Sequence, residues 1–240
     1  MKILTFNIKM RPIPFQRNKD RGNQISNLIS AKHFDILCLQ EHFTSKYKFL
    51  TGSFDMDLNT FLPELECVYS PMTSSRLTFC DSGLAIYTRF EVLHTLFYPF
   101  SKSKFIDRVA EKGVLYAKLR LSPTTMESVH VFNTHTQSGN RKSERKVRAS
   151  QIEELYSFIH DITKNDNYKI IIAGDFNEDV STEIRPEFRA YENCPRTGKT
   201  FKNERLDFII IQHHTRTRCK RVSLETFNNL SDHLGVSITI

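Results

Sequence analysis

Residues 170–179 read Ile-Ile-Ile-Ala-Gly-Asp-Phe-Asn-Glu-Asp, an apolar run that gives way abruptly to polar residues. The β-branched run predicts a buried strand that ends near Gly174. Asp175 and Asn177 share a parity, so both side chains can project to one side if the chain stays extended. An Asp can orient or deprotonate a water, and an Asn can donate to a phosphoryl oxygen. An ordinary Gly-Asp-Asn turn has the same local pattern, so the rest of the sequence must decide.

Polar residues recur at the ends of other strand-like runs, from one end of the chain to the other. Side chains at such places line a cleft rather than the core. Carboxylates, amides and imidazoles gathered there suit a divalent metal and a phosphoryl group. Glu41 alone, or the Asp232-His233 pair alone, would be better explained as a turn or capping residue, so the interpretation depends on the whole series. In chain order the series is Asn7, Glu41, His135, Asp175, Asn177, Asp207, Asp232 and His233.

The apolar patterns predict an α/β fold. Two segments, 17–32 and 143–164, place apolar residues on one helical face. Many strands with few helices indicate two β-sheets packed face to face and flanked by helices. Because site residues occur near both ends, we expect one domain over residues 1–240. Strands are expected near 2–7, 35–40, 84–88, 114–121, 128–134, 169–173, 206–211 and 235–240.

The amino-acid composition limits the kind of partner and the cellular compartment that we expect. The formal charge of +7 favours an anionic partner, although a generally basic surface would give the same value. Five cysteines without a C-x-x-C pair argue against a zinc or disulfide framework and fit a reducing compartment. The opening MKILTFN already reads as a strand, so we expect no signal peptide and a cytoplasmic or otherwise intracellular monomer, unless a leader has been removed. No apolar run approaches the length of a membrane span.

The expected chemistry assigns a role to each residue type. Glu41 ends the run DILCLQ, and with Asn7 on a neighbouring strand it suits a hard cation such as Mg²⁺. His233 is the expected general base. Its neighbour Asp232 is badly placed to bond its ring, so Asp175 or Asp207 is expected to orient it.

The ordered series resembles the endonuclease/exonuclease/phosphatase superfamily, which includes DNase I, apurinic endonucleases and sphingomyelinases. The resemblance implies a four-layer α/β sandwich and Mg²⁺-dependent (or Mn²⁺-dependent) hydrolysis of a phosphodiester. It implies that Asn177 and His135 grip phosphoryl oxygens and that Asp207 orients an imidazole, that of His135 or His233. Asp175 would orient His233 or replace it as the base, and Asp232 would assist the base or position a water on the metal.

Two stretches resemble the neutral and bacterial sphingomyelinases in particular. They are residues 81–86 with 111–116, and Asn133-Thr134-His135-Thr136-Gln137 followed by Arg148-Ala149-Ser150-Gln151. This implies a phospholipid substrate whose phosphorylated headgroup is released. A nuclease of the DNase I or apurinic type is the first alternative, since a charge of +7 suits nucleic acid equally well. A catalytically inactive relative that binds a partner is the second.

Membrane contact is expected at the segment Leu96–Phe105. It combines four aromatic rings with two lysines, a composition that suits a lipid interface. A core strand followed by its turn would have the same composition. For a nuclease, the basic stretch Arg141–Arg148 would instead lie near the substrate.

Overall fold

A computed structural model describes residues 1–10, 18–43, 62–71, 81–104, 110–125, 127–166, 169–180, 192–193, 198–212, 220–227 and 230–240. Two helices and twelve strands lie in these ranges. The helices are α1 (Asn18–Ser30) and α3 (Lys142–Thr163). The strands are β1 (Lys2–Met10), β2 (Ile36–His42), β3 (Glu66–Tyr69), β4 (Ala85–Thr88), β5 (Glu91–Pro99), β6 (Gly113–Arg120), β7 (Ser128–His135), β8 (Lys169–Asp175), β9 (Glu192–Asn193), β10 (Asp207–Gln212), β11 (Arg221–Glu225) and β12 (Gly235–Thr239).

The strands form two six-stranded sheets with the same pairing pattern. The first sheet has the order β11-β12-β1-β2-β4-β3, and the second has the order β5-β6-β7-β8-β10-β9. In each sheet one parallel pair, β1–β2 or β7–β8, is flanked by antiparallel strands. The expected fold of two mixed sheets is therefore confirmed, and every expected strand and both helices are present. The sequence analysis missed β3, β5, β9 and β11.

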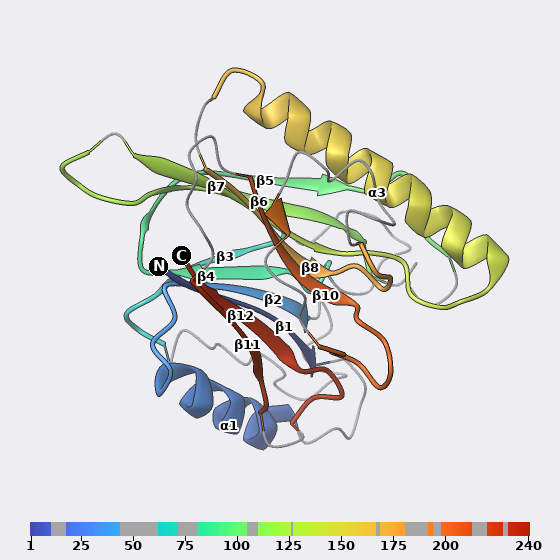
Figure 1. Cartoon of the computed structure of the whole chain (residues 1–240), viewed down its shortest axis with the longest axis horizontal. Coiled ribbons are helices and arrows are strands. Elements are labelled where there is room, and N and C mark those ends of the chain that lie inside the picture. The colour runs from blue at the N-terminus through green and yellow to red at the C-terminus, as the bar shows by residue number, and fades with distance from the viewer. Residues whose placement is uncertain are drawn as a thin grey trace.

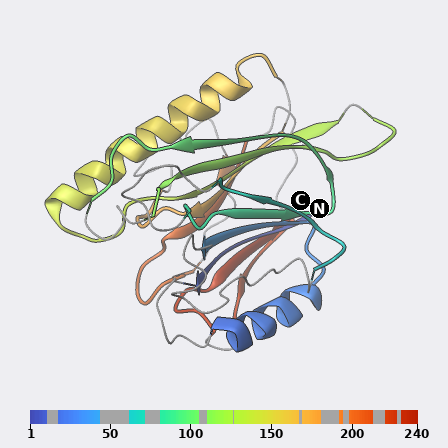
Figure 2. The same cartoon turned by 180° about the vertical axis from the view of Figure 1, so that it is seen from behind.

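Each helix covers the outer face of one sheet, which completes the four layers (Figures 1 and 2). Helix α1 buries Ile25 and Ile29 against the first sheet. Helix α3 buries Ile152, Leu155 and Ile159 against the second. The spacing of three and four residues puts these side chains on one helical face, and their burial stabilises each helix more than its own propensity does.

Alternation along the strands sorts side chains between the layers. On β8, Ile171 and Ala173 point into the space between the sheets, while Ile170 and Ile172 point toward α3. The same alternation holds for β1, β2, β7 and β10. Asp175 continues the inward-facing row of β8, so its parity aims it between the sheets at the strand end. Asn7, His135 and Asp207 continue the inward rows of β1, β7 and β10 in the same way.

The two sheets are tied together by buried amides one layer beneath these polar residues. The side-chain nitrogen of Asn133, on β7, donates to the carbonyl oxygens of Leu39 and Ala85 in the first sheet, both at 2.9 Å. Its side-chain oxygen accepts from Gln40 Nε2 at 2.7 Å. Asn133 and Gln40 are both fully buried. Since an unpaired buried amide would be costly, these bonds fix how the sheets align.

The segment Leu96–Phe105 begins on the edge strand β5. Leu96 is 39% exposed, whereas Phe97 packs against the core between the sheets and Phe100 is 8% exposed. Phe105 lies outside the described residues. The rings of Phe97 and Phe100 thus belong to the core, as the alternative interpretation of this segment expected. Among the described residues, no helix is long and apolar enough to cross a membrane.

Replacing Asn133 by Ala should destabilise the fold strongly, because it removes three buried hydrogen bonds, two to backbone carbonyls and one from Gln40. We expect a loss of about 2–4 kcal/mol in the free energy of unfolding, measured by urea denaturation. Ser128→Ala, at the far end of the same strand, is the matched control and should cost less than about 1 kcal/mol. Equal losses in the two variants would contradict the role assigned to the amide.

Candidate functional site

The site lies where the carboxyl ends of β1, β2, β7 and β8 meet, and its centre is the side chain of Asn7. The Asn7 side-chain nitrogen donates to Glu41 Oε1 at 3.2 Å and to Asp175 Oδ2 at 3.0 Å. Glu41 belongs to the first sheet and Asp175 to the second. One buried amide therefore brings two buried carboxylates from different sheets to the same point.

Backbone strain helps to aim these side chains. Glu41 has a φ of 53°, and the parity of β2 would otherwise turn its carboxylate toward α1. Lys9 and Asn177 also have positive φ, at 52° and 50°. A left-handed conformation costs most non-glycine residues about 1–2 kcal/mol, and such residues gather at functional sites.

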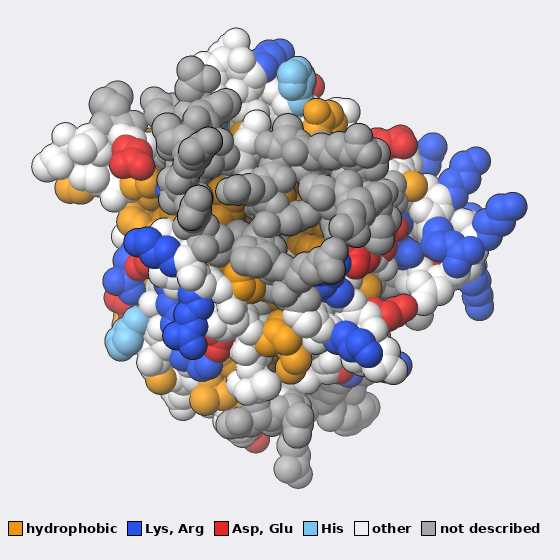
Figure 3. Space-filling model, viewed as in Figure 1, with side chains coloured by type: hydrophobic (Ala, Val, Ile, Leu, Met, Phe, Trp, Pro, Cys, Tyr) orange, Lys and Arg blue, Asp and Glu red, His pale blue; other side chains and the backbone are white. Residues whose placement is uncertain are grey.

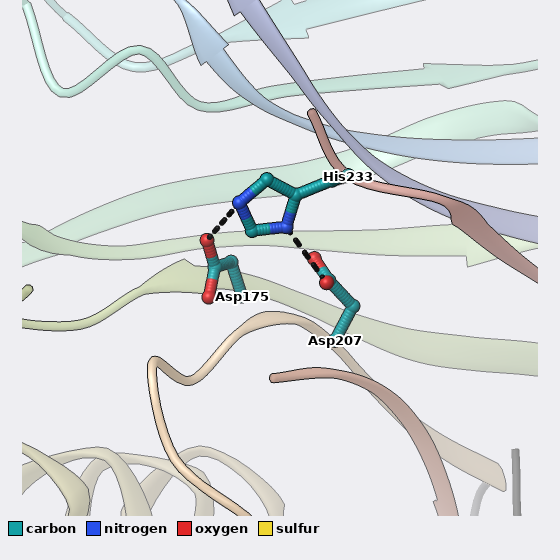
Figure 4. A group of neighbouring side chains, drawn as sticks. All are labelled: Asp175, Asp207 and His233. Atoms are coloured by element: carbon teal, nitrogen blue, oxygen red, sulfur yellow. Dashed lines mark hydrogen bonds and ion pairs between the residues drawn. The ribbon is translucent and has the colours of Figure 1, made fainter. Parts of the chain in front are cut away.

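Elsewhere in the site, the carboxylate of Asp207 and the imidazole of His233 form a hydrogen-bonded pair, called the dyad below (Figure 4). His233 Nδ1 lies 2.9 Å from Asp207 Oδ2, and both side chains are buried. Asp207 is thus the acid that orients His233, one of the two that the sequence left open. The Thr200 hydroxyl accepts hydrogen bonds from the backbone N–H groups of Leu206 and Asp207 and fixes the start of β10.

Asp175 is the point on which the imidazoles converge. Its Oδ2 lies 3.4 Å from His135 Nε2 and 3.8 Å from His233 Nε2. It pairs directly across from Asp207 in the antiparallel register of β8 and β10. Burial, followed by the nearby Asp207 carboxylate, raises the pKa of Asp175 above its usual range, while both imidazoles oppose this shift.

The loops after β7 and β8 are joined to each other. Thr136 donates its N–H to the carbonyl of Asp175, and Asn177 donates its side-chain N–H to the carbonyl of Thr136 at 3.0 Å. The backbone N–H of Asn177 donates to Asp175 Oδ1 at 2.9 Å. An amide nitrogen carries two hydrogens, so Asn177 keeps one for another acceptor. Gly174 is required here, because a Cβ would lie 2.1 Å from the Thr134 carbonyl oxygen.

Asp232 lies at the rim. Its carboxylate is exposed and pairs with Lys9 Nζ at 2.7 Å. It raises the pKa of His233 only as a minor contributor. Burial lowers the pKa of Arg21, on α1, and the nearby carboxylates of Asp232 and Glu41 partly oppose this shift. Neither Arg21 nor Lys9 belongs to a sequence motif, and only the fold places them at the site.

The pKa of His233 is raised to about 9. Burial would lower it, but the hydrogen bond and charge of Asp207, followed by the charge of Asp175, outweigh the cost of desolvation. The Asp207 and Asp175 carboxylates thus favour the protonated form of His233 over the neutral form.

Residues 4–233 match the model of the Endonuclease/Exonuclease/phosphatase family. The chain belongs to this family. Within the family, it is 26% identical over 175 residues to a sphingomyelinase of Dictyostelium discoideum, covering 60% of this chain and 37% of that protein. It is 30% identical over 101 residues to sphingomyelinase C of Bacillus cereus, covering 40% of this chain and 29% of that protein. The aligned stretches thus span about a third of the length of these relatives.

Solved structures bear out the family fold over the whole chain. One structure of Staphylococcus aureus beta toxin superposes with a TM-score of 0.79 at 18% identity, covering 100% of this chain and 99% of that one. A second beta toxin structure, which has bound magnesium ions, gives a TM-score of 0.76 at 18% identity and covers 99% of this chain and 98% of that one. At these identities the likeness shows the fold alone.

Two sets of side chains in this family member could hold a cation. Glu41 and Asn7 form the set expected from the sequence. Asp175, Asp207 and His233 form a second set, with one ligand atom from each lying within 4.8 Å of the others. Each set is already joined by a hydrogen bond: His233 Nδ1 lies 2.9 Å from Asp207, and the Asn7 side-chain nitrogen lies 3.2 Å from Glu41. Mg²⁺ and Mn²⁺ prefer oxygen ligands, which favours the first set.

The titration of His233 should report its dyad directly. In metal-free protein, NMR should give His233 a pKa of about 9. Asp207→Asn should lower the pKa of His233 to its ordinary value of about 6.5 or below, because the carboxylate that opposes the effect of burial is lost. Asp232→Asn is the control and should leave it near 9.

The same shift predicts a stability change with pH. A raised folded-state pKa means that the dyad stabilises the fold fully below about pH 6.5. This contribution is lost as the pH rises through about 9. A wild-type His233 that titrates near 6.5 would contradict the dyad.

Proposed function

We propose that this protein is a divalent-metal-dependent phosphodiesterase, and that its substrate is a phospholipid from which it releases the phosphorylated headgroup. The observation that carries the proposal is the convergence of two imidazoles and Asn7 on Asp175, beside Glu41. Family membership supports hydrolysis of a phosphoester. The similarity to sphingomyelinases supports the lipid substrate.

The donor set fits a hard cation at Glu41. Glu41 and Asp175 are both buried, and they share one amide nitrogen, so their negative charges lie close together. Buried carboxylates in such proximity favour a bound cation of opposite charge. We propose that Glu41 holds Mg²⁺ or Mn²⁺ together with Asn7, which would bind through its side-chain oxygen, the atom that here accepts the Lys9 N–H at 3.0 Å. A beta toxin structure of the same fold has bound magnesium ions. When bound, such an ion neutralises charge that develops on the phosphoryl oxygens.

The remaining residues surround the place where a phosphoryl group would lie. His135 ends β7 and Asn177 lies in the loop after β8, and each can donate a hydrogen bond to a phosphoryl oxygen. His233 is a third possible donor, and its 2.9 Å contact with Asp207 keeps its ring in a fixed orientation. Asp232 and Lys9 pair at the rim, where their charges act on the site from a distance.

We propose Asp175 rather than His233 as the group that accepts the proton of the attacking water. A base must be unprotonated at working pH, and the Asp207 and Asp175 carboxylates favour the protonated form of His233. Asp175 lies between both imidazoles, and its raised pKa gives it more basicity than an ordinary carboxylate. This differs from the expectation from sequence, in which His233 was the base and Asp175 its rival.

A nuclease is the second candidate, because basic side chains gather near one end of the site. Figure 3 shows Lys and Arg side chains clustered at the end of the molecule where α3 begins. Arg141, Lys142, Arg145 and Lys146 in this region are all exposed. Such a surface suits the phosphates of nucleic acid as well as anionic lipid headgroups. The full set of site residues argues against an inactive binding relative.

A side-by-side assay separates these candidates. With Mg²⁺, the protein should release phosphocholine from sphingomyelin vesicles and leave supercoiled plasmid DNA intact, and EDTA should abolish the release. Glu41→Gln should lower the rate by about 10²-fold or more, since one charged ligand is lost. Glu153→Gln, which removes an exposed carboxylate from α3, is the matched control.

Plasmid nicking without phosphocholine release would replace the lipid substrate by nucleic acid. Full activity in EDTA would contradict the metal requirement.

The pH dependence of the rate should be bell-shaped. On the acid side, the rate should fall as Asp175 takes up a proton. On the alkaline side, it should fall at or below about pH 9, as His233 loses its proton. Asp207→Asn should move the alkaline limb to lower pH, because it lowers the pKa of His233. A rate that keeps rising through pH 9 would instead make His233 the base.

A further inference from the structure

Arg148, on α3, is a charged side chain that is 2% exposed and ranks among the largest fully buried side chains of the protein. A buried guanidinium is stable only when its donors are paired. Burial of this kind is costly, and α3 offers many positions where an apolar residue would pack instead. The hydrogen bonds of Arg148 show which parts of the protein its side chain fixes in place.

Its donors reach two separate loops. Nη1 donates to the carbonyl oxygens of Gln137 and Gly139, both at 2.8 Å. Nε donates to Glu178 Oε2 at 2.9 Å, in an ion pair whose carboxylate side chain is 19% exposed. The planar fork of a guanidinium can serve several acceptors in different directions, which a lysine ammonium does not match.

Both loops carry residues of the site. Gln137 follows His135 by two positions, and Glu178 directly follows Asn177. A single side chain therefore joins the loop after β7 to the loop after β8, next to the two residues that would grip the phosphoryl group. We propose that Arg148, with Glu178, is a positioning pair that fixes the spacing between His135 and Asn177. This inference rests on the proposed function.

The same face of α3 fixes the rest of the first loop. Gln151 Oε1 accepts the backbone N–H of Gln137 at 2.7 Å, one turn along from Arg148. Gly139 has a φ of +88°, and a Cβ at this position would lie 2.3 Å from Glu144 Oε2. The loop after β7 is thus held closely against α3, so loss of the Arg148 side chain should displace the loop.

The pair is also reachable from solvent. Arg148 and Glu178 line a groove of about 590 Å³ that borders Asn177. Truncation of Arg148 to Ala would leave a space for a guanidinium ion at the wall of this groove. A small cation could then restore the contacts that the side chain made.

The test compares three variants in the intact chain. Arg148→Ala should lower kcat by about 10²-fold with KM changed less than about threefold, because misplaced groups lose transition-state contacts first. Millimolar guanidinium should restore much of kcat, while ammonium at equal ionic strength should not. Glu178→Gln, which keeps the shape of the side chain, should lower kcat by about tenfold, as expected for loss of one charged hydrogen bond. Leu155→Ala, a buried change on the same helix, is the control for lost stability.

Hydrogen exchange supplies a measurement that does not depend on activity. Arg148→Ala and Glu178→Gln should speed amide exchange in residues 136–139 and 176–179, and Leu155→Ala should not do so selectively. Exchange in both loops that matches the Leu155→Ala control, or equal loss of kcat in that control at the same stability, would overturn the proposal. Failure of the proposed function is a distinct result: wild type would hydrolyse no phosphodiester, and the exchange measurement would still decide whether Arg148 joins the loops.

Discussion

The structure depends on buried amides that bridge the two sheets, because each sheet contributes half of the site. Asn133 bonds to the backbone of the first sheet from the second, and Asn7 bonds to a carboxylate from each. Apolar packing alone lets two sheets slide, since hydrophobic contact has no direction. Directional hydrogen bonds in a dry interior allow one alignment only. The position of Glu41 opposite Asp175 follows from that alignment.

The site concentrates negative charge that the protein alone neutralises only in part. Burial and the neighbouring Asp207 raise the pKa of Asp175, and the same carboxylates outweigh desolvation to raise the pKa of His233. Both pKa values are thus raised within a few ångströms of each other, an arrangement that suits the proposed acid–base chemistry. A cation at Glu41 would complete the charge balance, and the exposed pair of Lys9 and Asp232 would modulate it from the rim.

The sequence predicted the site residues better than their contacts. The structure brings together the strand-end residues expected from the sequence. Alternation explains why Asn7, His135, Asp175 and Asp207 face the site, whereas Glu41 has the opposite parity and faces it only because of its positive φ. The sequence could not decide whether Asp207 or Asp175 bonds to the His233 ring, since this depends on the register of β8 with β10. Gln40 and Asn133 read as ordinary strand residues, although their inward parity was a usable signal. Arg148 belongs to a stretch that resembles the sphingomyelinases, but its contacts with two loops follow only from the fold. The edge strand β5 was missed because its exposed pattern lacks a clear apolar alternation.

The position of the metal ion tests the account most directly. A crystal of the protein soaked with Mn²⁺ should give an anomalous difference peak beside the Glu41 carboxylate, with the bond between His233 and Asp207 intact. An ion ligated instead by His233 Nδ1 and Asp207, with that bond broken, would contradict both the metal site and the proposed role of His233.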